Sequence, residues 1–247
     1  MKHILTLLLA LLHLTAWAQL PTVEPLGTYY VITEDGEEET GDVNGTVQNA
    51  PFRVLFTANP TVTEGYKSQP WYEWILWKAD EPQTILLRRN DETIEHEFRE
   101  SGTYVMQLRA IFYAEDPAAG DYEFPQDDED KKLITFTLSE SKLEFPNAIS
   151  PNGDGHNDIL RPKDGYKSIV SFHAAVYNRW GQKLYAWDDI HAGWDGKYKG
   201  STVKDGVYFL VVSAKGSDGI NYNIKKAINV ISGFSHGDST NGTENNE

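Results

Sequence analysis

Three oxygen-bearing side chains at alternate positions form the strongest metal-ligand pattern in this sequence. Asn152, Asp154 and Asp158 stand in a glycine-containing loop. Calcium takes six to eight oxygen ligands, and calcium loops supply them from alternate positions. Here His156 replaces one oxygen ligand, and Lys163 stands where a closing acidic residue would be expected. Two interpretations remain open: a calcium site, or a turn in which Asn and Asp side chains accept hydrogen bonds from backbone amides.

Two groups of aromatic residues could bind a partner. Trp71 and Trp77 fall on one face of a predicted strand, opposite Trp74, and their rings could stack on sugars. The same rings could instead cover the second face of the sheet or a domain interface. The run from Asn178 to Gly181, which comprises Asn178, Arg179, Trp180 and Gly181, is a second candidate because Arg and Trp are enriched at interface hot spots. For Trp194 we expect core packing.

No catalytic constellation is evident, and we predict that the protein is not an enzyme. The sequence lacks His-Glu-x-x-His and has no cysteine, so thiol chemistry and disulfides are excluded. Its seven histidines show no metal-ligand spacing. Calcium remains the only candidate cofactor.

These candidate residues would be positioned by β-strands. From Ala50 to Ser139, apolar residues alternate with polar ones in short segments separated by turn signals, and no segment keeps a helical period. Phe52, Val54, Phe56 and Ala58 share one face, for example. Short alternating strands with frequent turns predict an all-β sandwich.

The first region resembles a PKD, or polycystic kidney disease, immunoglobulin-like domain. The resemblance rests on Trp74 and on the runs His96 to Phe98 and Ser101 to Leu108. Tyr104 corresponds to the buried tyrosine at a strand corner in such sandwiches. The usual Gly-Asp-Gly turn after the tryptophan strand is replaced by residues 78–82. The resemblance implies an immunoglobulin-like β-sandwich over residues 19–141, serving as an adhesion or binding module for a glycan or a surface protein.

The remaining strands are expected at residues 169–177, 183–187, 207–214 and 224–231. From Val207 to Val212 both alternating sets are apolar, a pattern typical of a central strand buried on both faces. Asn178 to Gly181 and Asp218-Gly219 are predicted hairpin turns. Glu140 to Lys142 is a short linker, so we expect the two domains to be closely spaced.

Four sequence blocks in this region resemble the gliding motility-associated C-terminal domain, the type B sorting domain of type IX secretion in Bacteroidota. They occur in the right order and spacing: residues 145–158, 176–185, 193–200 and 205–208. The resemblance implies a second β-sandwich over residues 142–232. It also implies recognition by the type IX translocon and an outer-membrane partner protein.

Residues 1–18 are predicted to be a cleaved signal peptide. Lys2 precedes an apolar run, and Ala16-Trp17-Ala18 forms a small-x-small cleavage site. We therefore expect export through the inner membrane to the cell surface or the medium, with the periplasm as the alternative. Residues 233–247 are rich in Ser, Asn, Gly and Glu and are predicted to be a disordered tail.

Charge is shared unevenly along the chain. The net charge is −15 overall; residues 19–141 carry 9 basic and 25 acidic residues, whereas residues 142–232 carry 12 and 9. An acidic first half repels nucleic acid and anionic lipid, so neither is expected as a partner. The acidic runs at Glu34 to Asp42 and Ala114 to Asp130 are predicted to be exposed loops.

Two functional hypotheses follow. The first is a non-enzymatic surface or secreted protein with an adhesive sandwich and a C-terminal sorting domain. The second is a periplasmic or outer-membrane assembly component of the gliding or secretion machinery. An accessory protein of a carbohydrate-active enzyme is a third.

Overall fold

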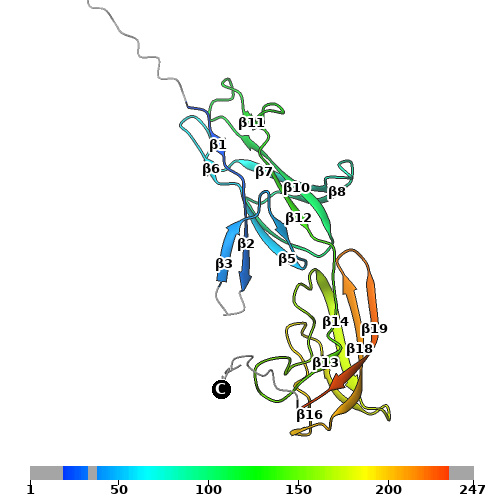
Figure 1. The fold of residues 1–247 in the computed structure, drawn as a ribbon. Coiled ribbons are helices and arrows are strands. Elements are labelled where there is room, and N and C mark those ends of the chain that lie inside the picture. Colours follow the sequence, from blue (N-terminus) through cyan, green and yellow to red (C-terminus); the bar gives the residue numbers. More distant parts are fainter. Residues whose placement is uncertain (1–18, 33–37, 234–247) are drawn as a thin grey trace, which may run out of the picture.

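The computed structural model describes residues 19–32 and 38–233, and this part of the chain is built from strands and turns without an α-helix. The predicted all-β class is confirmed. The predicted signal peptide and most of the predicted tail lie outside the described residues. Within the described ranges, no helix is long and apolar enough to cross a membrane. Figure 1 shows two β-rich parts arranged end to end.

The N-terminal part is a sandwich of two main sheets. One sheet has the order β4-β12-β10-β7-β8, with β11 also paired to β10, and the other has the order β3-β2-β5-β9. A short pair, β1 and β6, lies beside them. The strands are β1 (Thr22–Val23), β2 (Leu26–Ile32), β3 (Glu38–Asp42), β4 (Val47–Gln48), β5 (Phe52–Thr57), β6 (Pro60–Thr61), β7 (Trp71–Lys78), β8 (Ile85–Arg89), β9 (Thr93–Phe98), β10 (Gly102–Phe112), β11 (Tyr122–Phe124) and β12 (Leu133–Leu138).

Aromatic residues fill the space between these two sheets. Trp74 is fully buried, and its indole N–H donates to the Asp91 carbonyl at 3.0 Å. Tyr104 is also buried, and its hydroxyl donates to the Glu100 carbonyl at 2.8 Å. Burial raises the pKa of Tyr104 to about 12. The predicted corner tyrosine is therefore present, with its hydroxyl bonded to nearby backbone.

The first acidic run differs from its prediction as an exposed loop. Residues 38–42 form β3, which pairs with β2 along its whole length. The strand stands at the edge of its sheet, where charged side chains face solvent without cost and discourage pairing with other chains. The second run, Ala114 to Asp130, is mostly loop but contains β11, which pairs with β10.

The C-terminal part is built on a five-stranded sheet of order β13-β19-β18-β14-β15. A small ribbon, β16-β17, lies at one end of it. Together with the segment from Leu143 to Ile169, the sheet encloses a second hydrophobic core that contains Trp194. The strands are β13 (Ala148–Ile149), β14 (Ile169–Tyr177), β15 (Lys183–Trp187), β16 (Lys197–Tyr198), β17 (Ser201–Thr202), β18 (Gly206–Gly216) and β19 (Asn221–Val230).

The prediction that Val207 to Val212 is buried on both faces is wrong. Leu210 and Val212 are buried, but Val207 is 48 % exposed and Phe209 is 43 % exposed. The core residues of this domain lie on one face of the sheet, where the segment from Leu143 to Ile169 covers it. The outer face of β18 near its start therefore keeps apolar side chains in solvent.

The two parts are joined by a polar contact that we call the clasp: Ser139, Ser141, Ser168, Ser217 and Asp218. The hydroxyls of Ser139 and Ser168 are 2.8 Å apart, and the Ser217 hydroxyl donates to the Ser139 carbonyl at 3.2 Å. The Ser141 amide donates to the Asp218 carboxylate at 2.8 Å. Ser168 and Ser217 are buried. The short linker thus runs through a hydrogen-bonded junction.

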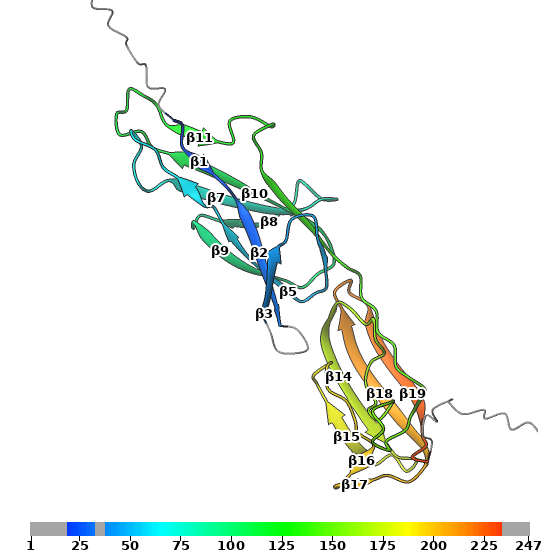
Figure 2. The same ribbon diagram turned by 60° about the vertical axis from the view of Figure 1, so that its left-hand side comes forward.

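Contacts from the sandwich complete this junction. The Ser101 amide donates to the Ser217 carbonyl at 3.0 Å, and the Ala50 amide donates to the Ser168 hydroxyl at 3.2 Å. Arg99 also donates to the Val170 carbonyl at 3.2 Å. Because these bonds come from several loops, they oppose hinge bending about the linker. Figure 2 shows the resulting extended molecule, with β11 near one end and β16 and β17 at the other.

Candidate functional site

The turn between β14 and β15 forms part of the rim of a groove in the C-terminal domain. The Asn178 amide donates to the Gln182 carbonyl at 3.0 Å. The Asn178 side-chain oxygen in turn accepts from the amides of Trp180 and Gln182, each at 3.0 Å. Gly181 has a φ of 79°, which glycine adopts without strain. The asparagine and the glycine therefore fix a turn that presents Arg179 and Trp180 outward.

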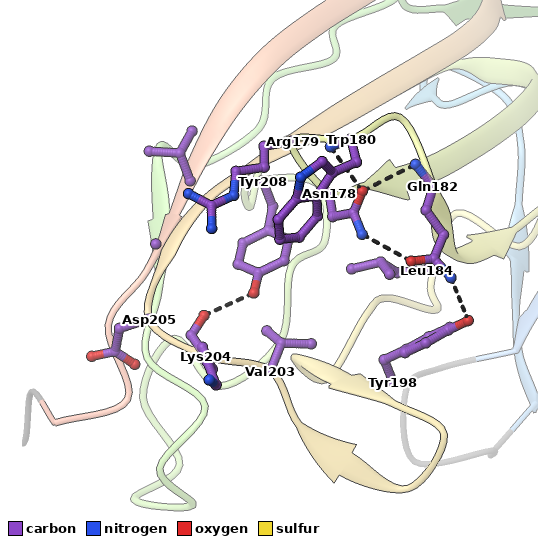
Figure 3. A pocket seen from close by; sticks show the side chains of 12 residues that line it. Asn178, Arg179, Trp180, Gln182, Leu184, Tyr198, Val203, Lys204, Asp205 and Tyr208 are labelled. Carbon is purple, nitrogen blue, oxygen red and sulfur yellow. Dashed lines mark hydrogen bonds between the residues drawn. The ribbon is translucent and has the colours of Figure 1, made fainter.

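The groove beside this turn has a volume of about 480 Å³ and is lined by residues from three chain segments. One wall comes from the turn, and the far wall comes from Tyr198 and from Val203 to Tyr208, which leads into β18. Figure 3 shows that Tyr208 lies close to Arg179 and Trp180, whereas Tyr198 lies farther from them, beside Gln182. The Tyr198 hydroxyl accepts a hydrogen bond from Gln182 at 3.0 Å, which ties the β16-β17 ribbon to the turn.

Two cations stand at this groove. The Arg179 guanidinium lies 4.4 Å from the centre of the Trp180 ring, a distance at which cation–π attraction holds both groups. Trp180 is 75 % exposed, so its ring is available to a partner. Within residues 19–32 and 38–233, neither Arg179 nor Lys204 forms an ion pair. The groove is therefore electropositive, aromatic and open.

The far wall is held by its own hydrogen bonds. The Tyr208 hydroxyl donates to the Lys204 carbonyl at 2.8 Å. Burial raises the pKa of Tyr208, against the nearby positive charge of Arg179. The single acidic residue of the groove, Asp205, accepts hydrogen bonds from the amide and hydroxyl of Ser232 at 2.9 and 2.5 Å. These bonds lower the pKa of the Asp205 carboxyl. A ligand at this site would meet unpaired positive charge, while the acidic group is already engaged.

The sequence singled out the turn but missed the other wall. Tyr198, Lys204 and Tyr208 lie 16 or more positions beyond Gln182, and only the closure of the sheet brings them to it. Two of the four sequence blocks that resemble the sorting domain, at residues 193–200 and 205–208, did contain Tyr198 and Tyr208. Those blocks were the signal available from sequence.

In the candidate calcium loop, the carboxylates accept hydrogen bonds from the backbone amides of the same loop. The Asp158 carboxylate accepts hydrogen bonds from the amides of Asn152, Gly153 and Gly155 at 2.7 to 2.9 Å. The Asp154 carboxylate accepts from the amide of His156 and the side chain of Asn152. This is the geometry of the turn interpretation. No group of three or more His, Cys, Asp or Glu residues suited to a metal occurs among the described residues, and the calcium site stays a prediction.

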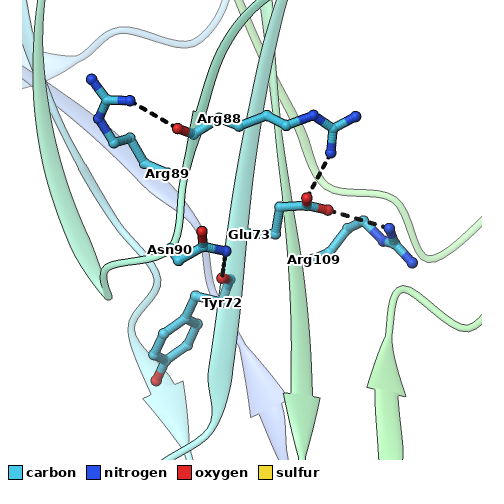
Figure 4. A network of polar contacts seen from close by, with 6 residues as sticks. All are labelled: Tyr72, Glu73, Arg88, Arg89, Asn90 and Arg109. Carbon is cyan, nitrogen blue, oxygen red and sulfur yellow. Dashed lines mark hydrogen bonds and ion pairs between the residues drawn. The ribbon is translucent and has the colours of Figure 1, made fainter.

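The candidate glycan residues lie on the outer face of β7 but are not brought together. Trp71 and Trp77 are half-buried, and Glu73 and Ile75 stand between them on the same face. Figure 4 shows Glu73 held between Arg88 and Arg109, at 2.6 and 3.3 Å. This outer face, with two separated indole rings and a carboxylate held by two arginines, is still a candidate surface for sugars. Glycan binding stays a prediction.

One short match to a hydrolase motif, Gly-Phe-Ser-His-Gly, stands at residues 233–237. In hydrolases this motif needs a sharp turn from a strand into a helix. The match follows β19, and all but its first residue lie outside the described part of the chain. It carries no catalytic argument.

Comparison with known structures shows only weak likeness. The chain resembles the FN1–FN3 domains of chicken CNTN1, with 13 % identity and a TM-score of 0.26 over 80 % of this chain and 76 % of that one. For dimeric latent PorU of Porphyromonas gingivalis the identity is 14 % and the TM-score 0.25, over 86 % of this chain but only 20 % of that one. For a tetra-tandem repeat from the extending region of a large adhesion protein the values are 10 % and 0.25, over 85 % and 57 %.

Comparison with protein families gives a more specific result. A search of curated proteins found no match. Residues 143–228 match the family model of the CHU_C type IX secretion signal domain. This range begins at the first core residue of the C-terminal part and ends within β19, so it contains both walls of the groove. The part of the chain that carries the groove is thus similar to a type IX secretion signal domain.

Proposed function

We propose that this protein is a non-enzymatic cargo of type IX secretion whose C-terminal domain is its sorting signal. The observation that carries the proposal is the match of residues 143–228 to the CHU_C type IX secretion signal domain. Such a signal implies export across the envelope to the cell surface or the extracellular space.

The groove is the surface that we propose the type IX translocon, or its outer-membrane partner protein, recognises. An exposed Trp with a stacked Arg is a typical anchor of an interface, because both side chains present large contact areas. The exposed Val207 lines the groove, and the exposed Phe209, two positions farther along β18, extends the apolar surface. In Figure 2 the β16-β17 ribbon, whose Tyr198 lines the groove, lies at the end of the C-terminal part farther from the sandwich.

Two engineered proteins test this proposal in a host with type IX secretion. In the first, residues 142–247 follow a signal peptide and a reporter; in the second, the whole chain carries Arg179→Gln and Trp180→Ala. We expect the reporter to leave the cell and the variant chain to stay in the periplasm, with its thermal unfolding unchanged. A reporter retained in the periplasm would overturn the sorting role of the C-terminal domain. Normal export of the variant would show that the groove is not needed for sorting.

For the N-terminal sandwich we propose an adhesion or binding role. The outer face of β7 supports it, since Trp71 and Trp77 offer half-buried rings and the arginines around Glu73 offer hydrogen-bond donors. A glycan array probed with the whole chain tests this role. Binding that is lost in Trp71→Ala would support it, and an array without signal would leave surface proteins as the ligand class.

The alternative is an assembly component of the gliding or secretion machinery that stays in the periplasm. Its C-terminal domain would then bind the machinery without being exported. Protease treatment of intact cells separates the two: digestion of the chain supports a surface cargo, and full protection supports the periplasmic component.

A further inference from the structure

The groove offers two cations to a carboxylate, and among the described residues neither Arg179 nor Lys204 is paired with one. Arg179 is stacked on Trp180, which restricts the guanidinium before any ligand arrives. Its planar set of donors matches a carboxylate in a two-pronged arrangement. Lys204 adds a second cation on the other wall, and Leu184, Val203 and Val207 add apolar lining. An acidic peptide with an apolar residue fits this combination.

The chain itself passes the wall of the groove after its last strand. β19 ends at Val230, and Ser232 is hydrogen-bonded to Asp205 through both its amide and its hydroxyl. Asp205 lines the groove. Gly233, the last described residue, directly follows this anchor, and in sequence Phe234 is only two positions, or at most about 7 Å of chain, beyond Ser232.

The composition of residues 234–247 complements the groove. They contain Asp238, Glu244 and Glu247, and no Lys or Arg. The domain that carries the groove has the opposite balance, with 12 basic and 9 acidic residues over residues 142–232. Opposite charge favours contact, and tethering raises the local concentration of the acidic segment to the order of millimolar.

We propose that residues 234–247 bind in the groove of their own chain and cover Arg179 and Trp180. The proposed binding is argued from the groove, from the Ser232–Asp205 anchor and from the opposite charges, and it does not depend on the proposed function. Its consequence rests on the proposed function: the segment would compete with the secretion machinery for the sorting surface, and displacement of the segment would be a step of recognition.

Peptide binding to purified protein tests the proposal. A synthetic peptide of residues 234–247 is titrated into the mature chain ending at Gly233 and into the mature chain ending at Glu247. Calorimetry reports affinity, and the NMR shift of the Trp180 indole N–H reports location. We expect saturable binding to the shorter chain and about ten-fold weaker binding to the longer one, whose own segment competes at high local concentration.

Charge variants show whether the groove is the site. In the shorter chain, Arg179→Gln with Lys204→Gln should weaken binding by about ten-fold, since charged hydrogen-bonded pairs carry the contact. Lys215→Gln, an exposed lysine at the opposite end of β18, is the matched control and should bind normally. Thermal unfolding of each variant checks that the fold is kept.

Several outcomes would overturn the proposal. These are the absence of peptide binding to the shorter chain, equal binding by both chains, and binding that survives the double variant. Self-association of the shorter chain by sedimentation, with loss of peptide binding, would instead assign the groove to an acidic loop of a second copy. None of these results bears on export of the reporter, so failure of this inference is distinguishable from failure of the sorting function.

Discussion

Two tryptophans in neighbouring turns have opposite environments at the residue scale. Trp194 is fully buried, and its indole N–H donates to the Lys197 carbonyl at 2.8 Å. Trp180 presents most of its surface to solvent. The first stabilises the domain, whereas the second is free to bind a partner. From the sequence we expected Trp194 to pack in the core and Trp180 to bind a partner. The sequence could not show this difference directly, because the two turns contain similar residues.

The first prediction concerns these two residues. We expect Trp194→Ala to lower the free energy of unfolding by about 3–5 kcal/mol, since it leaves a large cavity and an unpaired carbonyl. Trp180→Ala should change it by no more than about 0.5 kcal/mol. Urea denaturation of both variants measures the difference. Equal stability losses would mean that the Asn178–Gln182 turn is part of the core.

The second prediction concerns Asp158, which accepts three amide hydrogen bonds. Asp158→Asn should cost about 1–3 kcal/mol, because an amide side chain cannot accept on both of its ends. Asp164→Asn is the control, since Asp164 is exposed on a neighbouring loop. With the turn interpretation, added calcium should leave the melting temperature of the native chain unchanged. A calcium-dependent rise would support the metal site instead.

At the scale of elements, the β18–β19 hairpin connects the two domains through its tip. Gly216 ends β18, and a Cβ at this position would lie 2.0 Å from the Ser141 hydroxyl oxygen. Only glycine fits so close to the linker. The β18–β19 hairpin therefore comes closest to the linker at Gly216, a residue without a side chain.

The third prediction follows from this contact. Gly216→Ala should force the hairpin away from the linker and lower the free energy of unfolding by about 1–3 kcal/mol, the usual cost of overpacking. Gly233→Ala, where a Cβ would meet no atom within 4 Å, is the control. Scanning calorimetry measures both variants. Unchanged stability in Gly216→Ala would mean that the clasp residues can move to make room for the methyl group without loss of free energy of unfolding.

The fourth prediction concerns acid. Burial alone would raise the pKa of Asp218, but hydrogen bonds from Ser141 and Ile220 outweigh it and lower the pKa below its ordinary value. The folded state thus favours the carboxylate, so this stabilisation is complete above the unfolded pKa of about 3.9 and is lost as pH falls through the lower folded value. Melting temperatures between pH 6 and about pH 3 should fall less steeply in Asp218→Asn than in the native chain. Parallel curves would exclude this role.

Sequence patterns predicted the elements better than the contacts between them. Alternation located β5, β7 and β10, because the period of two reports a half-buried strand directly. It failed for Val207 and Phe209, since an apolar pattern cannot show whether a second layer covers that face. It failed for β3, because charge density says nothing against an edge strand. The clasp serines had no local signal, as their partners lie far along the chain, and the blocks that contain Tyr198 and Tyr208 did not show that these residues face the turn.

At the scale of the whole molecule, the two ends of the extended chain carry opposite charge. The acidic run from Ala114 to Asp130 follows β10 at the far end of the sandwich, and the cationic groove lies at the far end of the C-terminal domain. The clasp between them fixes the angle of the two domains. A partner at one end therefore meets a molecule whose other end has a defined position.

The fifth prediction tests this fixed geometry. Small-angle X-ray scattering of the native mature chain should fit one extended conformation. The double variant Ser141→Ala with Asp218→Ala should give a broader distribution of dimensions, because the linker then loses its hydrogen bonds to the hairpin. Identical distributions would show that the remaining contacts, from Ser101 and Arg99, are sufficient.

The length and direction of β18 have a mechanical consequence. This strand starts beside the groove, runs for 11 residues, about 36 Å, and ends at the junction with the sandwich. It pairs with β19 from Gly206 to Lys215 and with β14 from Phe209 to Gly216. A pull applied at the groove would load these hydrogen bonds in parallel, as shear, instead of peeling them apart one by one. We therefore expect this sheet to resist a pull along its strands while the domain stays folded.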